Sequence, residues 1–321
     1  MKRLVIAISL LAIFLVSGCV GAQSETPTEG SGGVLSNLFG KKTEISYKPF
    51  VTGTDGLAFS FVKGEPPESA LIAEQFPITF VVENRGAIDV PAGKLKLSMS
   101  NARVFGLGST GAKTNSEKLA ARQITGLAGS KEIIEIGEAK FAGIPPLAAE
   151  SKAIVIDTCY PYKTKLAAEL CAAARDGECD PAAQKSFYSS SAPVQFSEYK
   201  QISARKNADG MFDLSFSFKV RNAGTGTVYK NAGCSEGSEL ASIESVNFAG
   251  QQYFGEEKLS CFPDIYRDGI ILSDDKEGRT MRCTLKGVPA LTGFQEQLQI
   301  TISYSYAEII ITNVVIIPTE T

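Results

Sequence analysis

Hydrophobic residues at every second position are the feature that most restricts the fold of this 321-residue chain. From Phe76 to Val82, and again from Phe212 to Val220, apolar side chains recur with this period and lead into an Asn-x-Gly turn. Successive side chains of a strand point to opposite faces, so the pattern is typical of half-buried strands in antiparallel sheets. The chain is therefore predicted to be all-β.

The alternating stretches belong to an internal repeat. With a shift of 138 residues, five positions in and just after the first stretch match five in and after the second: Phe80, Val82, Asn84, Gly86 and Val90 against Phe218, Val220, Asn222, Gly224 and Val228. With a shift of 144, residues 141–147 match 285–291, and Tyr160 and Tyr162 match Tyr304 and Tyr306. Two matches in the same order with nearly equal shifts indicate two copies of one domain.

Each copy has short strands with a turn signal about every ten residues, which predicts a β-sandwich with immunoglobulin-like (Ig-like) topology. We expect a first Ig-like sandwich with a cysteine-rich end at residues 47–179 and a linker at 180–191. A second sandwich is expected at residues 192–321.

The first residues predict export from the cytoplasm. Lys2 and Arg3 precede an apolar run, Leu4 to Val16, which as a helix is about 20 Å long. A bilayer core is about 30 Å thick, so residues 1–19 are interpreted as a signal peptide. Residues 20–46 are rich in Gly, Ser, Thr and Glu and are predicted to be a flexible tether.

Val16-Ser17-Gly18-Cys19 resembles the lipobox of prokaryotic lipoproteins. The resemblance implies cleavage before Cys19, a lipid on its sulfur, and a location on the extracytoplasmic face of the cell membrane. An ordinary cleaved signal peptide and an uncleaved anchor are the alternatives. In every case the rest of the chain is expected outside the cytoplasm.

A second resemblance concerns the repeat. The Asn-x-Gly turn after an apolar strand resembles CARDB-type and related Ig-like modules of archaeal and bacterial surface proteins. Gly56-Leu57 with Pro66-Pro67, and Tyr160-Pro161-Tyr162, are similar to features of archaeal surface proteins with such tandem domains. The resemblance implies an adhesive, scaffolding or spacer role and carries no catalytic residue across.

Composition restricts the chemistry further. The chain has no histidine, which excludes Ser-His-Asp and Cys-His sites and removes the usual zinc ligand. Without Lys2 and Arg3, 30 basic residues stand against 35 acidic ones, so the exported chain has a net charge of −5. A mildly acidic chain without a basic cluster is not expected to bind nucleic acid.

Seven cysteines occur, and assigning Cys19 to the lipid leaves six, a number that favours three disulfides in an oxidising space. Cys159 and Cys171 are expected to face each other across a hairpin centred near Lys165. Cys261 and Cys283 are the second expected pair because both lie in strand-like runs. By elimination Cys179 would join Cys234, although six cysteines allow fifteen pairings.

Two loops are candidate binding sites. Gly106, Gly108 and Gly111 fit Gly-x-Gly-x-x-Gly, and Lys113 follows one residue too late for a phosphate-binding loop. A Gly/Ser-rich loop that contacts a partner is the preferred interpretation. Five acidic residues form a candidate calcium loop: Asp264, Asp268, Asp274, Asp275 and Glu277. The alternative is that these acids are exposed and only solvated. No other cofactor is expected.

Glu132, Glu135 and Glu138 are the acids considered for glycoside cleavage, which needs two carboxylates held across a cleft. Sequence spacing does not show such an arrangement, so no enzymatic activity is expected. The leading hypothesis is a lipid-anchored, non-catalytic binding, adhesion or structural module that contacts a surface protein or glycan. An accessory spacer subunit of a cell-envelope, pilus or secretion assembly is the first alternative, and an extracellular carbohydrate-active enzyme is a distant one.

Overall fold

The computed structural model describes residues 48–108, 112–172, 179–180, 182–230, 233–235, 240–253, 255–263, 269–272, 277–289 and 295–319. These residues belong to one compact unit, Tyr47–Thr321. Apart from one short 3-10 helix, η1 (Ala102–Phe105), the regular elements among them are β-strands, and the prediction of an all-β sandwich protein is confirmed.

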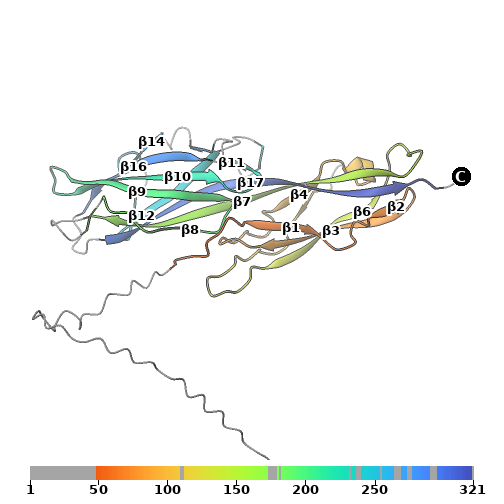
Figure 1. Ribbon diagram of the computed structural model, residues 1–321, viewed down its shortest axis with the longest axis horizontal. Coiled ribbons are helices and arrows are strands. Elements are labelled where there is room, and N and C mark those ends of the chain that lie inside the picture. Colours follow the sequence, from red (N-terminus) through yellow and green to blue (C-terminus); the bar gives the residue numbers. More distant parts are fainter. Residues whose placement is uncertain are drawn as a thin grey trace, which may run out of the picture. The chain divides into compact units, whose positions relative to one another are not determined.

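Two long antiparallel strands, β7 (Glu150–Cys171) and β17 (Gln295–Ile317), run through the whole unit (Figure 1). They pair from Glu150 opposite Ile316 to Cys171 opposite Gln295. At about 3.3 Å per residue, β7 is roughly 70 Å long. Shorter strands complete this long sheet: β2 (Ser69–Leu71), β4 (Lys96–Met99), β5 (Lys113–Thr114), β8 (Phe187–Ser189), β11 (Thr227–Tyr229), β12 (Leu240–Phe248), β13 (Gln251–Gln252) and β15 (Ile270–Ile271).

Two smaller sheets cover different lengths of the long sheet (Figure 1). The first small sheet has the order β1-β3-β6 and consists of β1 (Leu57–Phe61), β3 (Gln75–Asn84) and β6 (Lys131–Lys140). This sheet and the part of the long sheet that it covers are called the β3 half. The second small sheet has the order β14-β16-β10-β9 and consists of β9 (Val194–Lys206), β10 (Phe212–Asn222), β14 (Leu259–Phe262) and β16 (Arg279–Val288). This sheet and the part of the long sheet that it covers are called the β10 half.

The hydrophobic core follows the alternation in the sequence. In β3, Ile78, Phe80 and Val82 are fully buried, and in β10 Phe216 and Val220 are fully buried in the same way. Burying a side chain of this size contributes roughly 1.5–3 kcal/mol relative to exposure. The even-numbered residues of β7 and β17 face this core, so both small sheets pack on the same face of the long sheet.

The sequence did not reveal that β7 and β17 are shared between the halves. Residues 150–160 of β7 lie in the β3 half, whereas residues 164–171 extend into the β10 half and pair there with β17. The segment expected to be a linker, 180–191, contains β8, which pairs with residues 166–168 of β7. The two halves are therefore joined by a continuous ladder of backbone hydrogen bonds.

The expected hairpin near Lys165 is wrong for the same reason, because β7 continues straight through that residue. Cys171 lies twelve positions after Cys159 in the same extended strand, which places the two residues about 40 Å apart. Disulfide partners need Cα atoms within about 7 Å. Cys159 is instead bonded to Cys234, and Cys171 to Cys179, in place of the expected Cys159–Cys171 and Cys179–Cys234 pairs.

The bond between Cys261 and Cys283 is confirmed. These residues lie directly opposite each other in β14 and β16, with Cα atoms 4.1 Å apart. All six cysteines beyond Cys19 are therefore paired, as their even number predicted.

Candidate functional site

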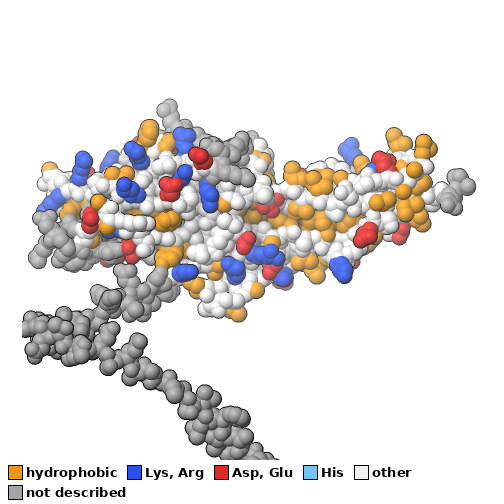
Figure 2. Space-filling model, in the orientation of Figure 1, with side chains coloured by type: hydrophobic (Ala, Val, Ile, Leu, Met, Phe, Trp, Pro, Cys, Tyr) orange, Lys and Arg blue, Asp and Glu red, His pale blue; other side chains and the backbone are white. Residues whose placement is uncertain are grey.

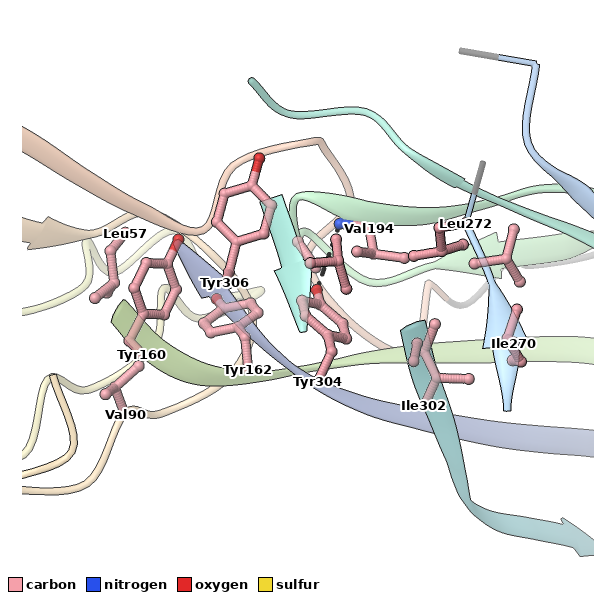
Figure 3. Close-up of a cluster of buried hydrophobic side chains, with 14 of the residues drawn as sticks. Leu57, Val90, Tyr160, Tyr162, Val194, Ile270, Leu272, Ile302, Tyr304 and Tyr306 are labelled. Atoms are coloured by element: carbon pink, nitrogen blue, oxygen red, sulfur yellow. Dashed lines mark hydrogen bonds between the residues drawn. The ribbon is translucent and has the colours of Figure 1, made fainter. Parts of the chain in front are cut away.

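A cluster of four tyrosines lies where the two halves meet. In the β7–β17 ladder Tyr162 is opposite Tyr304 and Tyr160 is opposite Tyr306, on either side of the central pair Pro161–Ser305 (Figure 3). Neighbouring ring centroids are 5.8–6.4 Å apart. The tyrosines are related in pairs about this centre, which places the two matched segments around one local twofold axis.

The two Asn-x-Gly turns are held in the same way. Asn84 Oδ1 accepts a hydrogen bond from the Gly86 N–H at 3.1 Å, and Asn222 Oδ1 accepts one from the Gly224 N–H at 3.2 Å. The side-chain amide of each asparagine donates to the carbonyl four residues later, at 2.8 and 2.7 Å. The repeat in the sequence therefore corresponds to a repeat in the contacts.

The tyrosine hydroxyls connect the cluster to these turns. Tyr162 Oη donates to Asn84 Oδ1 at 3.4 Å, and Tyr306 Oη donates to Asn222 Oδ1 at 3.5 Å. Tyr304 Oη accepts a hydrogen bond from the Val194 N–H in the β10 half (Figure 3). Burial raises the pKa of Tyr162 and Tyr304 well above the usual tyrosine value, so both hydroxyls are neutral at physiological pH.

Glu308 on β17 is a titratable group beside the cluster. Burial raises the pKa of its carboxyl above the ordinary value of 4.5. Burial, followed by the nearby Glu308 charge, raises the pKa of the Tyr160 hydroxyl, which is buried and has no hydrogen-bond partner among the described residues. An ionised Glu308 at neutral pH is therefore partly desolvated and destabilises the fold.

Replacing Glu308 with glutamine is expected to stabilise the protein at pH 7. The native carboxyl binds a proton more readily than the unfolded one, so its contribution to stability falls as pH rises from about 4.5 through the raised pKa. Glu83 and Asp89 have lowered pKa values, so their contribution to stability increases as the pH rises. The difference in urea-unfolding free energy between wild type and Glu308→Gln isolates the effect, and a pH-independent difference would contradict it.

A groove of about 820 Å³ lies on the outer face of the long sheet, beside the centre of the tyrosine cluster. One wall is the segment from Ala87 to Lys94, which follows the first Asn-x-Gly turn. The floor is formed by side chains of β7, β17 and β12, among them Lys163 and Thr301. Its volume lies within the range of about 300–1,000 Å³ that is typical of ligand pockets.

Charged side chains of both signs line the groove. Lys163 Nζ lies 2.6 Å from Glu244 Oε1 on the floor. On the wall, Asp89 accepts hydrogen bonds from Lys118 Nζ at 2.9 Å and from the Ala121 N–H at 2.7 Å. Lys94 and Lys165 have no acidic partner within 4 Å among the described residues, which leaves the groove with two uncompensated positive charges.

Sequence reasoning missed these groove residues because they lie far apart in the chain. One signal was present in the repeat. Pro91 stands where the second copy has Tyr229, and Pro161 stands where it has Ser305. A position-by-position comparison of the two copies would have shown that the prolines at 91 and 161 have no proline counterparts in the second copy.

A second hollow of about 500 Å³ lies over β9 and β10. Its lining includes the buried Lys185 and also Ser197, whose buried hydroxyl finds no hydrogen-bond partner in the described part of the chain.

An apolar stripe marks the outer face of the long sheet in the β3 half. Ile309 and Ile311 on β17 are 67% and 61% exposed, and Val155 lies opposite Ile311. Leu71, at the end of β2, is exposed beside Ile317. Figure 2 shows hydrophobic side chains gathered over this half of the molecule.

The glycine loop does not precede a helix. Gly106 has a left-handed φ of 65° and ends η1 by donating its N–H to the Arg103 carbonyl. Gly108 is described, Gly111 lies outside the described residues, and Lys113 begins β5, where it pairs with Leu97. A strand after the loop does not offer the helix N-terminus on which a phosphate-binding loop depends.

Most of the acidic loop is outside the described residues, namely Asp264, Asp268, Asp274 and Asp275. Glu277 is described and exposed. Within the described ranges, His, Cys, Asp and Glu side chains form no group of three that could hold a metal ion.

The three glutamates of β6 do not form one site. Glu132 has the same parity along the strand as the buried Ile134, and its Oε1 accepts hydrogen bonds from the Ser116 N–H and hydroxyl at 2.6 and 2.8 Å. Glu135 is exposed on the opposite face, and Glu138 is also exposed. Strand geometry thus separates Glu132 from Glu135.

Cys19, the predicted signal peptide and the predicted tether lie outside the described residues. In the part of the chain that is described, no helix is long and apolar enough to cross a membrane. The amino-acid sequence matches no family model and no curated protein sequence.

Proposed function

We propose that this protein is a lipid-anchored, non-catalytic binding module on the extracytoplasmic face of the cell membrane. Its Ig-like sandwiches hold the groove between the Ala87–Lys94 wall and β7 as a binding site. The groove is the observation that carries the proposal. It combines the volume of a ligand site with two lysines, Lys94 on the wall and Lys165 on β7, that have no acidic partner within 4 Å among the described residues.

Two further features support this assignment. Three disulfides among six cysteines are typical of proteins in oxidising spaces, in agreement with an exported chain. The signal peptide and lipobox-like Cys19 would attach the unit to lipid through residues 20–46. The chain enters the folded unit near its centre, where the Val51 carbonyl accepts a hydrogen bond from the Ser191 N–H.

The binding role is tested by photo-crosslinking on intact cells of the native host. A benzoylphenylalanine at Thr301, on the groove floor, is expected to give a defined crosslinked product. The same residue at Ile202, which is exposed on β9 outside the groove, is the matched control. Equal products from both positions, or none from Thr301, would count against the groove as a binding site.

Location is tested separately by mass spectrometry of the native protein. The expected result is a mature N-terminus at Cys19 carrying lipid, with the three disulfides intact. Full-length protein with free thiols in the cytoplasm would overturn this part of the proposal.

A second candidate function is an accessory subunit of a cell-envelope, pilus or secretion assembly. The apolar stripe with Ile309 and Ile311 favours it, because contiguous exposed apolar surface often marks a protein interface. In that case Ile309→Ser/Ile311→Ser would release the protein from a membrane complex while crosslinking from Thr301 stays unchanged.

A further inference from the structure

The two halves differ at one edge of the long sheet. In the β10 half, β11 pairs with β17 from Thr227 opposite Ala307 to Tyr229 opposite Ser305. The shift of 144 residues between the copies places Pro161 to Lys163 of β7 at the positions that correspond to Ser305 to Ala307 of β17. No described strand pairs with β7 there, because β4 ends its pairing at Cys159 and β8 begins at Leu166.

Two prolines explain why the chain's own segment does not pair at this edge. Pro91 occupies the position of Tyr229 and Pro161 that of Ser305. Proline has no N–H, so this pair cannot form either of the two hydrogen bonds that a pair in an antiparallel ladder exchanges. The adjacent Val90 exchanges backbone hydrogen bonds with Leu119 on the side away from β7, at 3.0 and 2.9 Å, and the groove lies between this wall and β7.

At this unpaired edge of β7, from Pro161 to Lys163, some backbone N–H and C=O groups are available to pair with another strand. The Val155 carbonyl accepts from Ser100 and the Lys165 carbonyl from Ser190, so odd-numbered residues point their backbone groups away from β17. The N–H and C=O of Lys163 and the C=O of Pro161 therefore point to the groove side. Within the described residues no hydrogen bond to these three groups is present.

Charge selects among the peptides that such an edge accepts. Lys94 and Lys165 lie at the groove without an acidic partner in the described residues, while the carboxylates of Asp89 and Glu244 are already paired with Lys118 and Lys163. Acidic side chains on an incoming strand would meet these two lysines. A basic strand would be repelled by these two lysines and would find both carboxylates of the groove already paired.

We propose that the groove binds an extended, acidic peptide segment, which adds to β7 at Pro161–Lys163 as a short strand. The segment takes the place that β11 takes in the β10 half. Strand addition to an exposed sheet edge draws affinity from main-chain hydrogen bonds and specificity from side chains. This inference rests on the proposed binding function and names the partner class.

The test is fluorescence anisotropy with full-length protein and a labelled octapeptide of alternating threonine and glutamate. Lys163→Pro removes one N–H on the groove side, and Pro161 two residues earlier shows that this edge accommodates proline. Lys94→Glu/Lys165→Glu reverses the free charges. Each variant is expected to weaken binding at least about tenfold, and Arg205→Glu, an exposed change on β9 outside the groove, less than about twofold.

A peptide with every backbone amide N-methylated keeps the charge but cannot pair as a strand, so it is expected not to bind. This arm needs no altered protein and holds even where Lys163→Pro does not fold. Equal binding of the methylated and unmethylated peptides would identify a general polyanion site and overturn strand addition. Absence of peptide binding combined with specific crosslinking from Thr301 overturns the inference alone, and absence of both overturns the proposed function as well.

Discussion

Replacing Cys159 and Cys234 together with alanine is expected to lower the free energy of unfolding by about 4.5 kcal/mol. The disulfide closes a segment of 75 residues, and the loss of unfolded-chain entropy grows with the logarithm of that length. The bond also ties the segment around Cys234 to β7, beside the central pair of the long sheet. Urea unfolding monitored by circular dichroism measures the change.

The other two disulfides are matched controls of different loop length. Cys261–Cys283 closes 22 residues and Cys171–Cys179 closes 8, so the same relation predicts losses of about 3.4 and 2.5 kcal/mol. The predicted order of stability losses follows loop length. If removing Cys171–Cys179 destabilised the protein most, the explanation by unfolded-chain entropy would be wrong for this protein.

Replacing Gly224 with alanine is expected to destabilise the protein by about 3 kcal/mol, at the upper end of the usual cost of overpacking. A Cβ at this position would lie only 2.1 Å from Tyr306 Oη and 3.1 Å from Pro193 Cβ. The turn cannot move away freely, because the Gly224 N–H is bonded to Asn222 Oδ1 and to the Pro193 carbonyl.

Tyr306→Phe supplies the control because it removes the atom nearest to the added Cβ. Phenylalanine alone should cost stability, since the Gly226 N–H donates to Tyr306 Oη at 2.7 Å. In the double variant with Gly224→Ala, the loss should be smaller than the sum of the single losses by at least about 1 kcal/mol. Additive losses would show that the hydroxyl is not the obstacle.

The alternation and the Asn-x-Gly repeat were sufficient to predict strands, an all-β sandwich and equivalent turns in two segments. The reason is local: a strand with one buried face needs an apolar residue at every second position, and Asn84 and Asn222 bond within four residues of themselves. The second match was less exact. Leu214 is the counterpart of Phe76 in the repeat. Leu214 pairs with Leu285, whereas Phe76 pairs with Ala139. Leu285 therefore corresponds to Ala139 in the structure and not to Phe141.

Disulfide partners were less predictable, because a bond depends on distance in space. Cys261 and Cys283 belong to neighbouring strands, so strand assignment was enough. For Cys159 the decisive fact was that β7 continues past Lys165, and only the pairing of its full length with β17 shows that.

The sequence by itself determined the strand periodicity, the duplicated turns with their tyrosines, the even number of cysteines and the exclusion of histidine chemistry. All of these depend on residue type and on contacts within a few positions. The tertiary structure alone decided that β7 and β17 run through both halves and that the Ala87–Lys94 wall stands apart from Pro161 and Lys163. These features involve residues that are at least 67 positions apart in the chain, and they arise only when the long ladder forms.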